Sequence, residues 1–305
     1  LVMKRTTTLI CCLIISFASF AQTTLAEHHF ESSDVKKVVI DGAFCDVFVT
    51  PGSRLVFDGI IKGSGKSGDY LIASIQTGTT VVFRVERKQE RNRGWSNIEL
   101  GKLALTLPEH IELKITNTSG DINVSDFTGE LEASTTSGDI VLKNINSDCW
   151  LKATSGDLRA RNVTGDIKMR STSGDQEYFE IRGNLETQAT SGNIECDKIK
   201  GNVKAFATSG DLDFDGVEGA IEAGTTSGNI TGDYVRITGD SRFKSTSGDI
   251  YFVFENEIES LGFDLRATSG DLRVGSSRSE DRLYMNRGQY TIAGESTSGD
   301  QVYKN

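Results

Sequence analysis

An eighteen-residue repeat constrains the fold of this chain more than any other feature. Thr-Ser-Gly followed by Asp or Asn occurs ten times. Self-similarity at a fixed period is typical of solenoids, in which each unit stacks on its neighbour. The serines of the first seven copies are eighteen residues apart, and the last three follow at spacings of 20, 22 and 29: Ser119, Ser137, Ser155, Ser173, Ser191, Ser209, Ser227, Ser247, Ser269 and Ser298.

Within each repeat, apolar residues recur at every second position. In the first copy Ile122 and Val124 precede Gly129, and Leu131 and Ala133 follow it. This alternation predicts short strands with one buried face, and its changes of phase at the two glycine positions predict corners. The chain is therefore expected to be all-β: a parallel β-solenoid, or single-stranded β-helix, with about 18 residues per coil. Nine or ten coils at about 4.8 Å each would give a rod roughly 45 Å long.

The Asp or Asn after each Ser-Gly is expected to form a column along the rod. Glycine reaches positive φ without steric cost, and a neighbouring Asp or Asn can bond backbone amides. Corner capping is favoured over a calcium ladder, because Asn193 and Asn229 interrupt the charge and the Gly-Gly-x-Gly-x-Asp calcium signature is missing. Calcium binding stays open. The threonine column also invites an ice-binding interpretation, which is disfavoured because only one threonine per coil recurs strictly.

Two less regular regions flank the strict period. Residues 27–116 are expected to form an irregular β cap, with β-like stretches at 35–40, 46–50, 79–85 and 103–107, and residues 117–305 to form the solenoid continuous with it. The longer C-terminal units contain Tyr251, Phe252, Phe254 and Phe263, which predicts a widened, aromatic-filled end. The last copy, at 297–300, is expected to close the rod as a final partial strand.

The first 26 residues are typical of a signal peptide. Lys4 and Arg5 precede an apolar run at 9–20, with small-residue cleavage candidates ending at Ala21 and Ala26. The run is too short to span a bilayer, which needs about 20 residues. Lipidation is disfavoured because Ile10 precedes Cys11 where a small residue belongs. The mature chain is therefore expected to be soluble and extracytoplasmic, in the periplasm, secreted or at the cell surface.

The net charge bears on the class of binding partner, and the cysteine content bears on disulfide formation. The chain has 33 Lys and Arg and 43 Asp and Glu, and removal of Lys4 and Arg5 leaves a net charge of −12. Nucleic acid is therefore not expected as a partner. Cys45, Cys149 and Cys196 are far apart and odd in number, which favours buried free thiols over a disulfide framework.

No catalytic, cofactor-binding or metal-binding residues are predicted, and no cofactor. The segment at 63–67 resembles a phosphate loop, but Ile60 stands where its first glycine belongs, so a glycine-rich hairpin is favoured. His28, His29 and His110 supply no base for the repeats. The arginine-rich segment at 84–93 contains Glu86 and Glu90 and is interpreted as a solvated loop rather than a polyanion site.

The segments 103–108 (Leu-Ala-Leu-Thr-Leu-Pro) and 113–116 (Leu-Lys-Ile-Thr), followed by the serial Thr-Ser-Gly-Asp units, resemble the DUF4097 family of bacterial proteins. The resemblance covers roughly residues 30–305. Proteins of this family are described as adhesins with β-strand repeats, related to head GIN domain proteins. The resemblance implies a cell-envelope β-solenoid without known catalytic residues.

The leading functional hypothesis is a non-enzymatic, adhesin-like scaffold that presents a rigid face to an envelope protein or glycan. A polysaccharide lyase or hydrolase of β-helix type is the enzymatic alternative, but such enzymes need a cleft between long loops, which the seven regular units do not provide. An envelope-stress accessory protein that binds a partner through its cap is the third possibility. The sequence leaves the ligand and the oligomeric state open.

Overall fold

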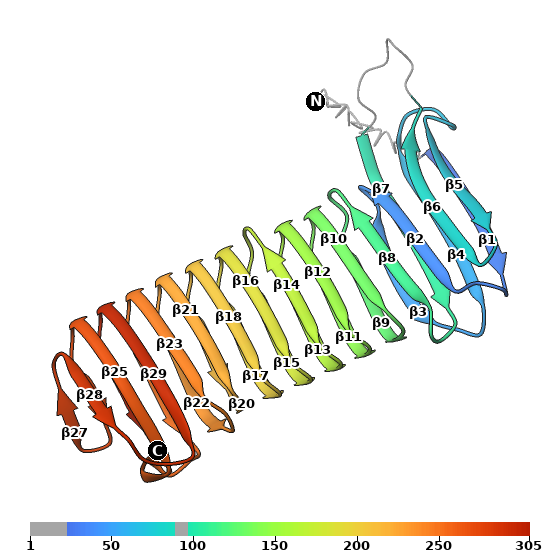
Figure 1. Ribbon diagram of the computed structural model, residues 1–305. Coiled ribbons are helices and arrows are strands. Elements are labelled where there is room, and N and C mark those ends of the chain that lie inside the picture. Colours follow the sequence, from blue (N-terminus) through green and yellow to red (C-terminus); the bar gives the residue numbers. More distant parts are fainter. Residues whose placement is uncertain (1–22, 89–96) are drawn as a thin grey trace, which may run out of the picture.

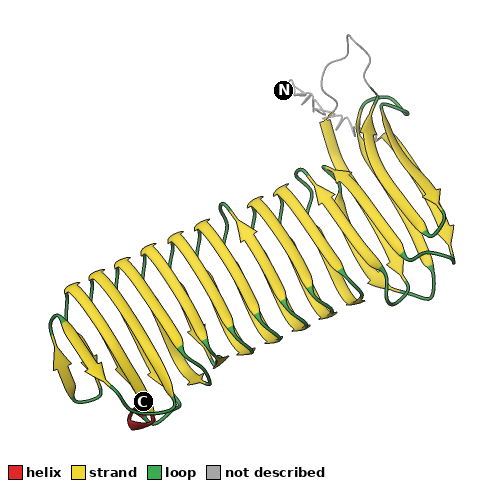
Figure 2. Cartoon of the chain, in the orientation of Figure 1, coloured by secondary structure: helices red, strands yellow, loops and turns green. Residues whose placement is uncertain are grey.

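The computed structural model describes residues 23–88 and 97–305, which form an elongated rod of two long sheets (Figure 1). Strands and short loops make up nearly all of it, with one 3-10 helix, η1 (Ile258–Ser260), at the C-terminal end (Figure 2). The predicted all-β parallel solenoid is confirmed. Within the described residues, no helix combines the length and apolar character needed to cross a membrane.

In this part of the chain sixteen strands form one sheet, sheet A, and fourteen form the other, sheet B. Sheet A contains β1 (Thr23–Ser32), β3 (Asp46–Pro51), β4 (Leu55–Ser64), β7 (Asn97–Leu107), β9 (Ile122–Thr128), β11 (Ile140–Asn146), β13 (Leu158–Thr164), β15 (Gln176–Arg182), β17 (Ile194–Lys200), β19 (Leu212–Asp215), β20 (Glu218–Gly219), β22 (Ile230–Ile237), β24 (Ile250–Phe254), β26 (Leu272–Val274), β27 (Ser277–Ser279) and β30 (Gln301–Lys304). Sheet B contains β2 (Lys37–Ala43), β5 (Tyr70–Thr77), β6 (Thr80–Arg87), β8 (Glu112–Asn117), β10 (Leu131–Ser137), β12 (Cys149–Ser155), β14 (Ile167–Ser171), β16 (Leu185–Ser191), β18 (Val203–Ser209), β21 (Ile221–Ser227), β23 (Ser241–Ser247), β25 (Leu261–Ser269), β28 (Arg282–Met285) and β29 (Tyr290–Ser298).

Each regular coil contributes one strand to each sheet. The chain leaves sheet B at the Ser-Gly-Asp turn, here called the first corner, and returns from sheet A at a second corner. Parallel pairing keeps equivalent residues in register, so that Ile140 pairs with Leu158 and Gln176 pairs with Ile194, and all four are buried. The predicted stacking of equivalent side chains into columns is therefore confirmed.

Backbone geometry explains why glycine recurs at the first corner. Gly156 has φ of +124°, and a Cβ there would lie 2.1 Å from the carbonyl oxygen of Gly138 in the preceding coil. A side chain at this position would be strained and would collide with backbone. The glycine requirement predicted for this turn is thus confirmed, and the close approach of the next coil adds to it.

The core between the sheets is filled by complementary large and small residues. Gly232 is an example, because a Cβ at this position would lie 2.3 Å from the ring of buried Phe252. Phe252 packs in turn against Phe243, with ring centroids 4.2 Å apart, and against Phe254 at 5.5 Å. Close-packed interiors tolerate such large rings only where a neighbour is small. The aromatic filling predicted for this end is present.

The N-terminal region covers one end of the rod with antiparallel strands. β1 pairs with β4 and β4 pairs with β7, while β5 pairs with β6. β2 and β3 pair in parallel with β8 and β9, so the cap continues directly into the first coil. The hairpin predicted at 63–67 is wrong, because β4 and β5 belong to different sheets and this segment connects them.

The order of the last coils also differs from the expectation. β29 lies between β23 and β25, and β30 lies between β24 and β26. The final Thr-Ser-Gly-Asp copy therefore inserts between the coils of Ser247 and Ser269, instead of closing the rod. The outer coil is covered by two short antiparallel strands, β27 against β26 and β28 against β25, which reduces the open edge.

Candidate functional site

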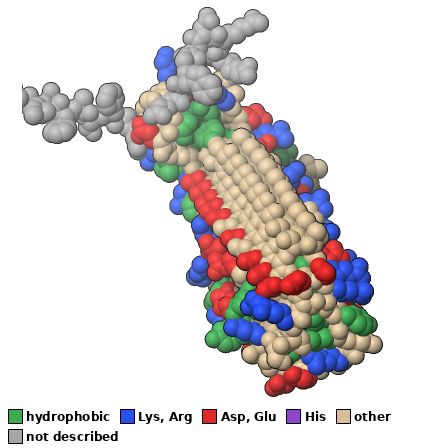
Figure 3. Space-filling view, turned by 90° about the vertical axis from the view of Figure 1, so that its left-hand side faces the viewer, with side chains coloured by type: hydrophobic (Ala, Val, Ile, Leu, Met, Phe, Trp, Pro, Cys, Tyr) green, Lys and Arg blue, Asp and Glu red, His purple; other side chains and the backbone are tan. Residues whose placement is uncertain are grey.

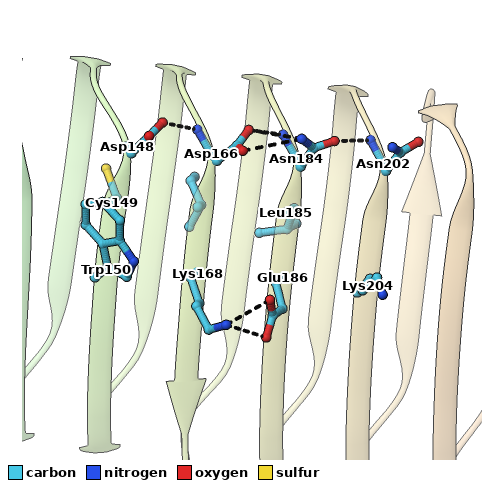
Figure 4. A pocket seen from close by; sticks show the side chains of 11 residues that line it. Asp148, Cys149, Trp150, Asp166, Lys168, Asn184, Leu185, Glu186, Asn202 and Lys204 are labelled. Atoms are coloured by element: carbon cyan, nitrogen blue, oxygen red, sulfur yellow. Dashed lines mark hydrogen bonds and ion pairs between the residues drawn. The ribbon is translucent and has the colours of Figure 1, made fainter.

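An open groove of about 380 Å³ lies on the outer face of sheet B beside the second corner (Figure 4). Its size falls within the range of small-molecule sites, about 300–1,000 Å³. We call it the Trp150 groove, after its single aromatic side chain. It is lined by Asp148, Cys149, Trp150, Asp166, Ile167, Lys168, Asn184, Leu185, Glu186, Asn202 and Lys204.

Trp150 faces outward because strand alternation places it between two inward residues, Cys149 and Leu151. Its side chain is 43% exposed. Its lateral partners in the sheet are Glu132 and Lys168. An indole ring at this position offers an apolar surface on an otherwise polar face.

Trp150 interrupts a column in which lysine and glutamate otherwise alternate from coil to coil. The nearest complete ion pairs on its two sides are Lys114 with Glu132, at 2.6 Å, and Lys168 with Glu186, at 2.9 Å. The hydrogen bond from Lys168 lowers the pKa of Glu186. Lys204 pairs with Glu222 at 3.1 Å further along. The floor of the groove is therefore nearly neutral, although it is built from charged residues.

The wall of the groove is a ladder of Asp and Asn side chains at the second corner. Oδ1 of Asp148 accepts the backbone N–H of Asp166 at 2.8 Å, and Oδ1 of Asp166 accepts that of Asn184 at 2.7 Å. In the same way, Oδ1 of Asn184 accepts the backbone N–H of Asn202, and Oδ1 of Asn202 accepts that of Ala220, both at 3.1 Å. Among the described residues no partner is found for Oδ2 of Asp148 or for Nδ2 of Asn202. One acceptor and one donor thus remain for a ligand.

A second hollow, of about 580 Å³, continues the groove toward the C-terminal end. It begins at Glu222, which pairs in register with Lys204 of the Trp150 groove. Its wall contains Asp240, whose Oδ1 accepts the backbone N–H of Thr291 at 2.9 Å, and Arg242 lies on its floor. The two hollows follow the same corner of the rod.

The predicted aspartate column at the first corner caps backbone amides, as expected. Oδ1 of Asp139 accepts the N–H of Asp157 at 2.9 Å, and the same bond recurs along the column from Asp46 to Asp271. Each side chain caps the next coil, rather than its own turn. In the part of the chain that the structure describes, no three His, Cys, Asp or Glu side chains are grouped to hold a metal ion.

The repeated threonines, whose side chains are expected to form a second column, are exposed in every copy: Thr118, Thr136, Thr154, Thr172, Thr190, Thr208, Thr226, Thr246, Thr268 and Thr297. Figure 3 shows a face of the rod on which backbone and side chains that are neither charged nor hydrophobic form straight rows, with acidic side chains along one edge. Such rows are the direct result of the eighteen-residue period.

The cysteines, histidines and arginines considered in the sequence analysis do not form a common site in the described part of the chain. Cys45, Cys149 and Cys196 are free and buried, as predicted. Burial raises the pKa of the Cys45 and Cys149 thiols to about 12. His28 and His29 lie in the cap, where they contact Ser74 and Asp58. Arg84 lies beside Asp41, at 3.5 Å, while residues 89–96 of the arginine-rich segment are outside the described residues.

The Trp150 groove was not predicted from the sequence. The available signal was a tryptophan at an outward position where the neighbouring repeats have lysine or glutamate. Recognising it requires comparison of one offset across all repeats, rather than a search for a motif.

The two-sheet parallel solenoid with stacked corner glycines defines the structural class of the protein. The Toastrack DUF4097 family model matches residues 35–215 and 202–304, and the chain belongs to this family. The resemblance stated from the sequence is thereby confirmed. No curated protein sequence matches the chain.

Matches to solved structures have low sequence identity. A candidate adhesin from Bacteroides fragilis is 17% identical, with a TM-score of 0.50, over 74% of this chain and 96% of its own. A candidate lipid binding protein from Parabacteroides distasonis is 12% identical, with a TM-score of 0.35, over 90% of this chain and 96% of its own. A candidate cell adhesion protein from Clostridium sporogenes is 10% identical, with a TM-score of 0.21, over 93% of this chain and 100% of its own.

Proposed function

We propose that this protein is an exported, non-enzymatic binding module of adhesin type, which recognises an envelope protein or glycan through the Trp150 groove. The observation that carries the proposal is the exposed indole of Trp150 in a groove whose charged floor is internally paired. A rigid solenoid suits this role, because stacked coils hold the contact groups in fixed register and little ordering is needed on binding.

The chemistry of the groove favours binding over catalysis. Hydrolysis of a glycosidic bond typically needs two carboxyl groups, one protonated as a general acid and the other ionised as a general base or nucleophile. The wall carboxylates Asp148 and Asp166 instead accept backbone amides of the next coil, which makes them structural caps. Glu186 is held by Lys168, and its lowered pKa favours the ionised form over the protonated form of a general acid.

Export is proposed from the leader-like segment, and the structure favours one of its two cleavage sites. Strand β1 begins at Thr23, and Leu25 is completely buried in the core. Cleavage after Ala26 would remove Leu25 and part of the pairing with β4. We therefore expect cleavage after Ala21, with Gln22 as the mature N-terminus. Intact-mass measurement of the protein from a periplasmic or secreted fraction tests this, and a mature chain beginning at Glu27 would contradict it.

The binding proposal is tested by incubating the purified protein with envelope extracts and glycan arrays. Retention by the wild type, and its loss in Trp150→Ala, is the expected result. Tyr234→Ala is a matched control, because Tyr234 is an exposed aromatic residue, 69% accessible, on sheet A, away from the groove. Equal retention of all three proteins would reject the groove as the binding site, and no retention in any assay would reject the binding function.

A further inference from the structure

We propose that the Trp150 groove binds a linear, uncharged glycan chain that lies along the axis of the rod. This inference rests on the proposed binding function and specifies its ligand. It is carried by three features of the groove: its direction, its combination of one apolar ring with regularly spaced hydrogen-bonding groups, and a charge distribution in which the lining lysines are paired and the wall is acidic.

The groove runs across successive coils. Its wall contributes one Asp or Asn side chain per coil from Asp148 to Asn202, and after Ala220 the second hollow follows the same corner to Asp240. Adjacent parallel strands are about 4.8 Å apart, which is close to the length of one sugar ring in an extended chain. A linear glycan can therefore present a similar set of hydroxyl groups to each coil.

Trp150 supplies the apolar contact that a sugar requires. One face of a hexose ring carries mainly C–H groups and packs on an aromatic ring, while its hydroxyl groups lie at the edge. At the groove these hydroxyl groups would meet Oδ2 of Asp148, an acceptor, and Nδ2 of Asn202, a donor. A protein partner fits less well, because stable protein interfaces are centred on several buried apolar or aromatic anchors.

The charge distribution favours an uncharged chain. Lys168 and Lys204 on the floor are already paired with Glu186 and Glu222. Asp148 and Asp166 on the wall bond only backbone amides and the Asn184 side chain, and no cation among the described residues forms an ion pair with them. An anionic polysaccharide would meet these carboxylates, while both lysines that line the groove, Lys168 and Lys204, are already paired with glutamates.

The experiment measures binding of purified mature protein to neutral oligosaccharides of two to eight residues and to polyuronate oligomers of equal length. Gluco-, manno-, xylo- and N-acetylglucosamine series serve as neutral probes. Affinity for a neutral series should increase with length and level off once the groove is filled. The affinity for a neutral series should change little between low and high salt, since the contacts between an uncharged glycan and the groove include no ion pair.

Two variants assign the binding to the groove. Trp150→Ala should weaken binding on the order of tenfold or more, as expected for loss of an aromatic anchor. Trp150→Phe, which keeps an aromatic face, should retain part of the affinity, and Tyr234→Ala should leave it unchanged. Melting curves of all variants check that the fold is retained.

Other binding results would overturn particular parts of the glycan proposal. Preference for polyuronates would overturn the charge argument, and affinity independent of chain length would overturn the extended binding mode. Binding of a purified envelope protein, with no affinity for any glycan in the neutral series, would overturn the glycan inference and leave the binding function standing. Loss of both would overturn the binding function itself.

Discussion

The backbone amide of Asn193 donates a hydrogen bond to Oδ1 of Asp175, at 2.8 Å, from one coil further along the rod. Oδ1 of Asn193 in turn accepts the amide of Asp211 at 3.0 Å. Aspartate and asparagine are thus equivalent in this ladder, because both provide the same acceptor oxygen. The ladder satisfies corner amides that the strands leave unpaired.

This equivalence predicts different effects for two substitutions of Asp175. Asp175→Asn retains the acceptor and should change the free energy of unfolding by less than about 0.5 kcal/mol, the usual effect at a site where no contact is lost. Asp175→Ala leaves the amide of Asn193 without its partner and should cost about 1–2 kcal/mol. Urea unfolding of both variants measures the difference, and equal losses would show that the charge of Asp175, rather than the hydrogen bond, is what stabilises the coil.

The first-corner glycines give a second prediction. Gly156→Val, and even Gly156→Ala, should destabilise the protein by more than the roughly 1–3 kcal/mol that an unfavourable φ costs, because the new Cβ would also collide with the Gly138 carbonyl. Gly68→Ala is the control, since Gly68 has φ of +88° with open space around it. Thermal melting should show a larger loss for Gly156→Ala. Similar losses at both glycines would mean that φ alone accounts for the effect.

The period, the buried columns and the first corner were predictable because they depend on local pattern. A residue such as Ile140 needs only alternation to be placed inside, and Gly156 needs only its position after serine to be placed at a corner. Repetition of the same pattern in ten copies then fixes the register, since a shift by one residue would expose every apolar side chain.

The features that were missed depend on contacts that the repeat does not encode. The coil of Ser298 inserts before that of Ser269 because any coil with the same register can pair with the exposed edge, so chain order does not determine stacking order. The left-handed φ of Asn162, 55°, recurs at the same offset in Glu180 and Lys198, at 57° and 56°, so the residue type at this position does not reveal it. The Trp150 groove is lined by residues from four successive coils. None of these follows from the spacing of one repeat.

A buried polar layer gives a third prediction. In the core, the hydroxyl of Tyr178 donates to Oε1 of Gln176 at 2.7 Å and contacts Oγ1 of Thr187 at 3.0 Å, and the Gln176 amide donates to Ser171. The same Ser-Thr-Ser-Gly-Asp-Gln-x-Tyr sequence recurs at 296–303, where the Gln and Tyr side chains are again bonded. The two layers place matching polar groups at defined coils.

Tyr178→Phe should lower the free energy of unfolding by about 1–2 kcal/mol, because it removes the hydroxyl that bonds both buried Gln176 and buried Thr187. The double variant Tyr178→Phe with Thr187→Val should cost less than the sum of the two single variants, since both act on the same network. Urea unfolding of the four proteins in this cycle measures the coupling. Strict additivity would show that the hydroxyl groups do not act together.

The buried thiols predict how stability depends on alkaline pH. Desolvation raises the pKa of Cys45 from 9.0 to about 12, and that of Cys149 also to about 12, with a smaller rise from the neighbouring aspartate in each case. Below pH 9 both thiols are protonated in the folded and unfolded states, so they cause no pH dependence. Between about pH 9 and 12 the unfolded chain ionises them while the folded protein holds them neutral. Stability should therefore fall as pH rises through this window.

Urea unfolding between pH 8 and 11 measures this effect, with Cys45→Ala and Cys149→Ala as comparison proteins. Each variant is expected to be less stable than the wild type at pH 8, because a buried side chain is shortened, but to lose less additional stability on the way to pH 11. Maleimide labelling at pH 8 should be slow in the folded protein and complete in denaturant, because the thiolate is the reactive species and both sulfur atoms are buried. Rapid labelling of the folded protein, or a pH slope unchanged by either substitution, would show that these thiols reach solvent without unfolding of the coils that enclose them.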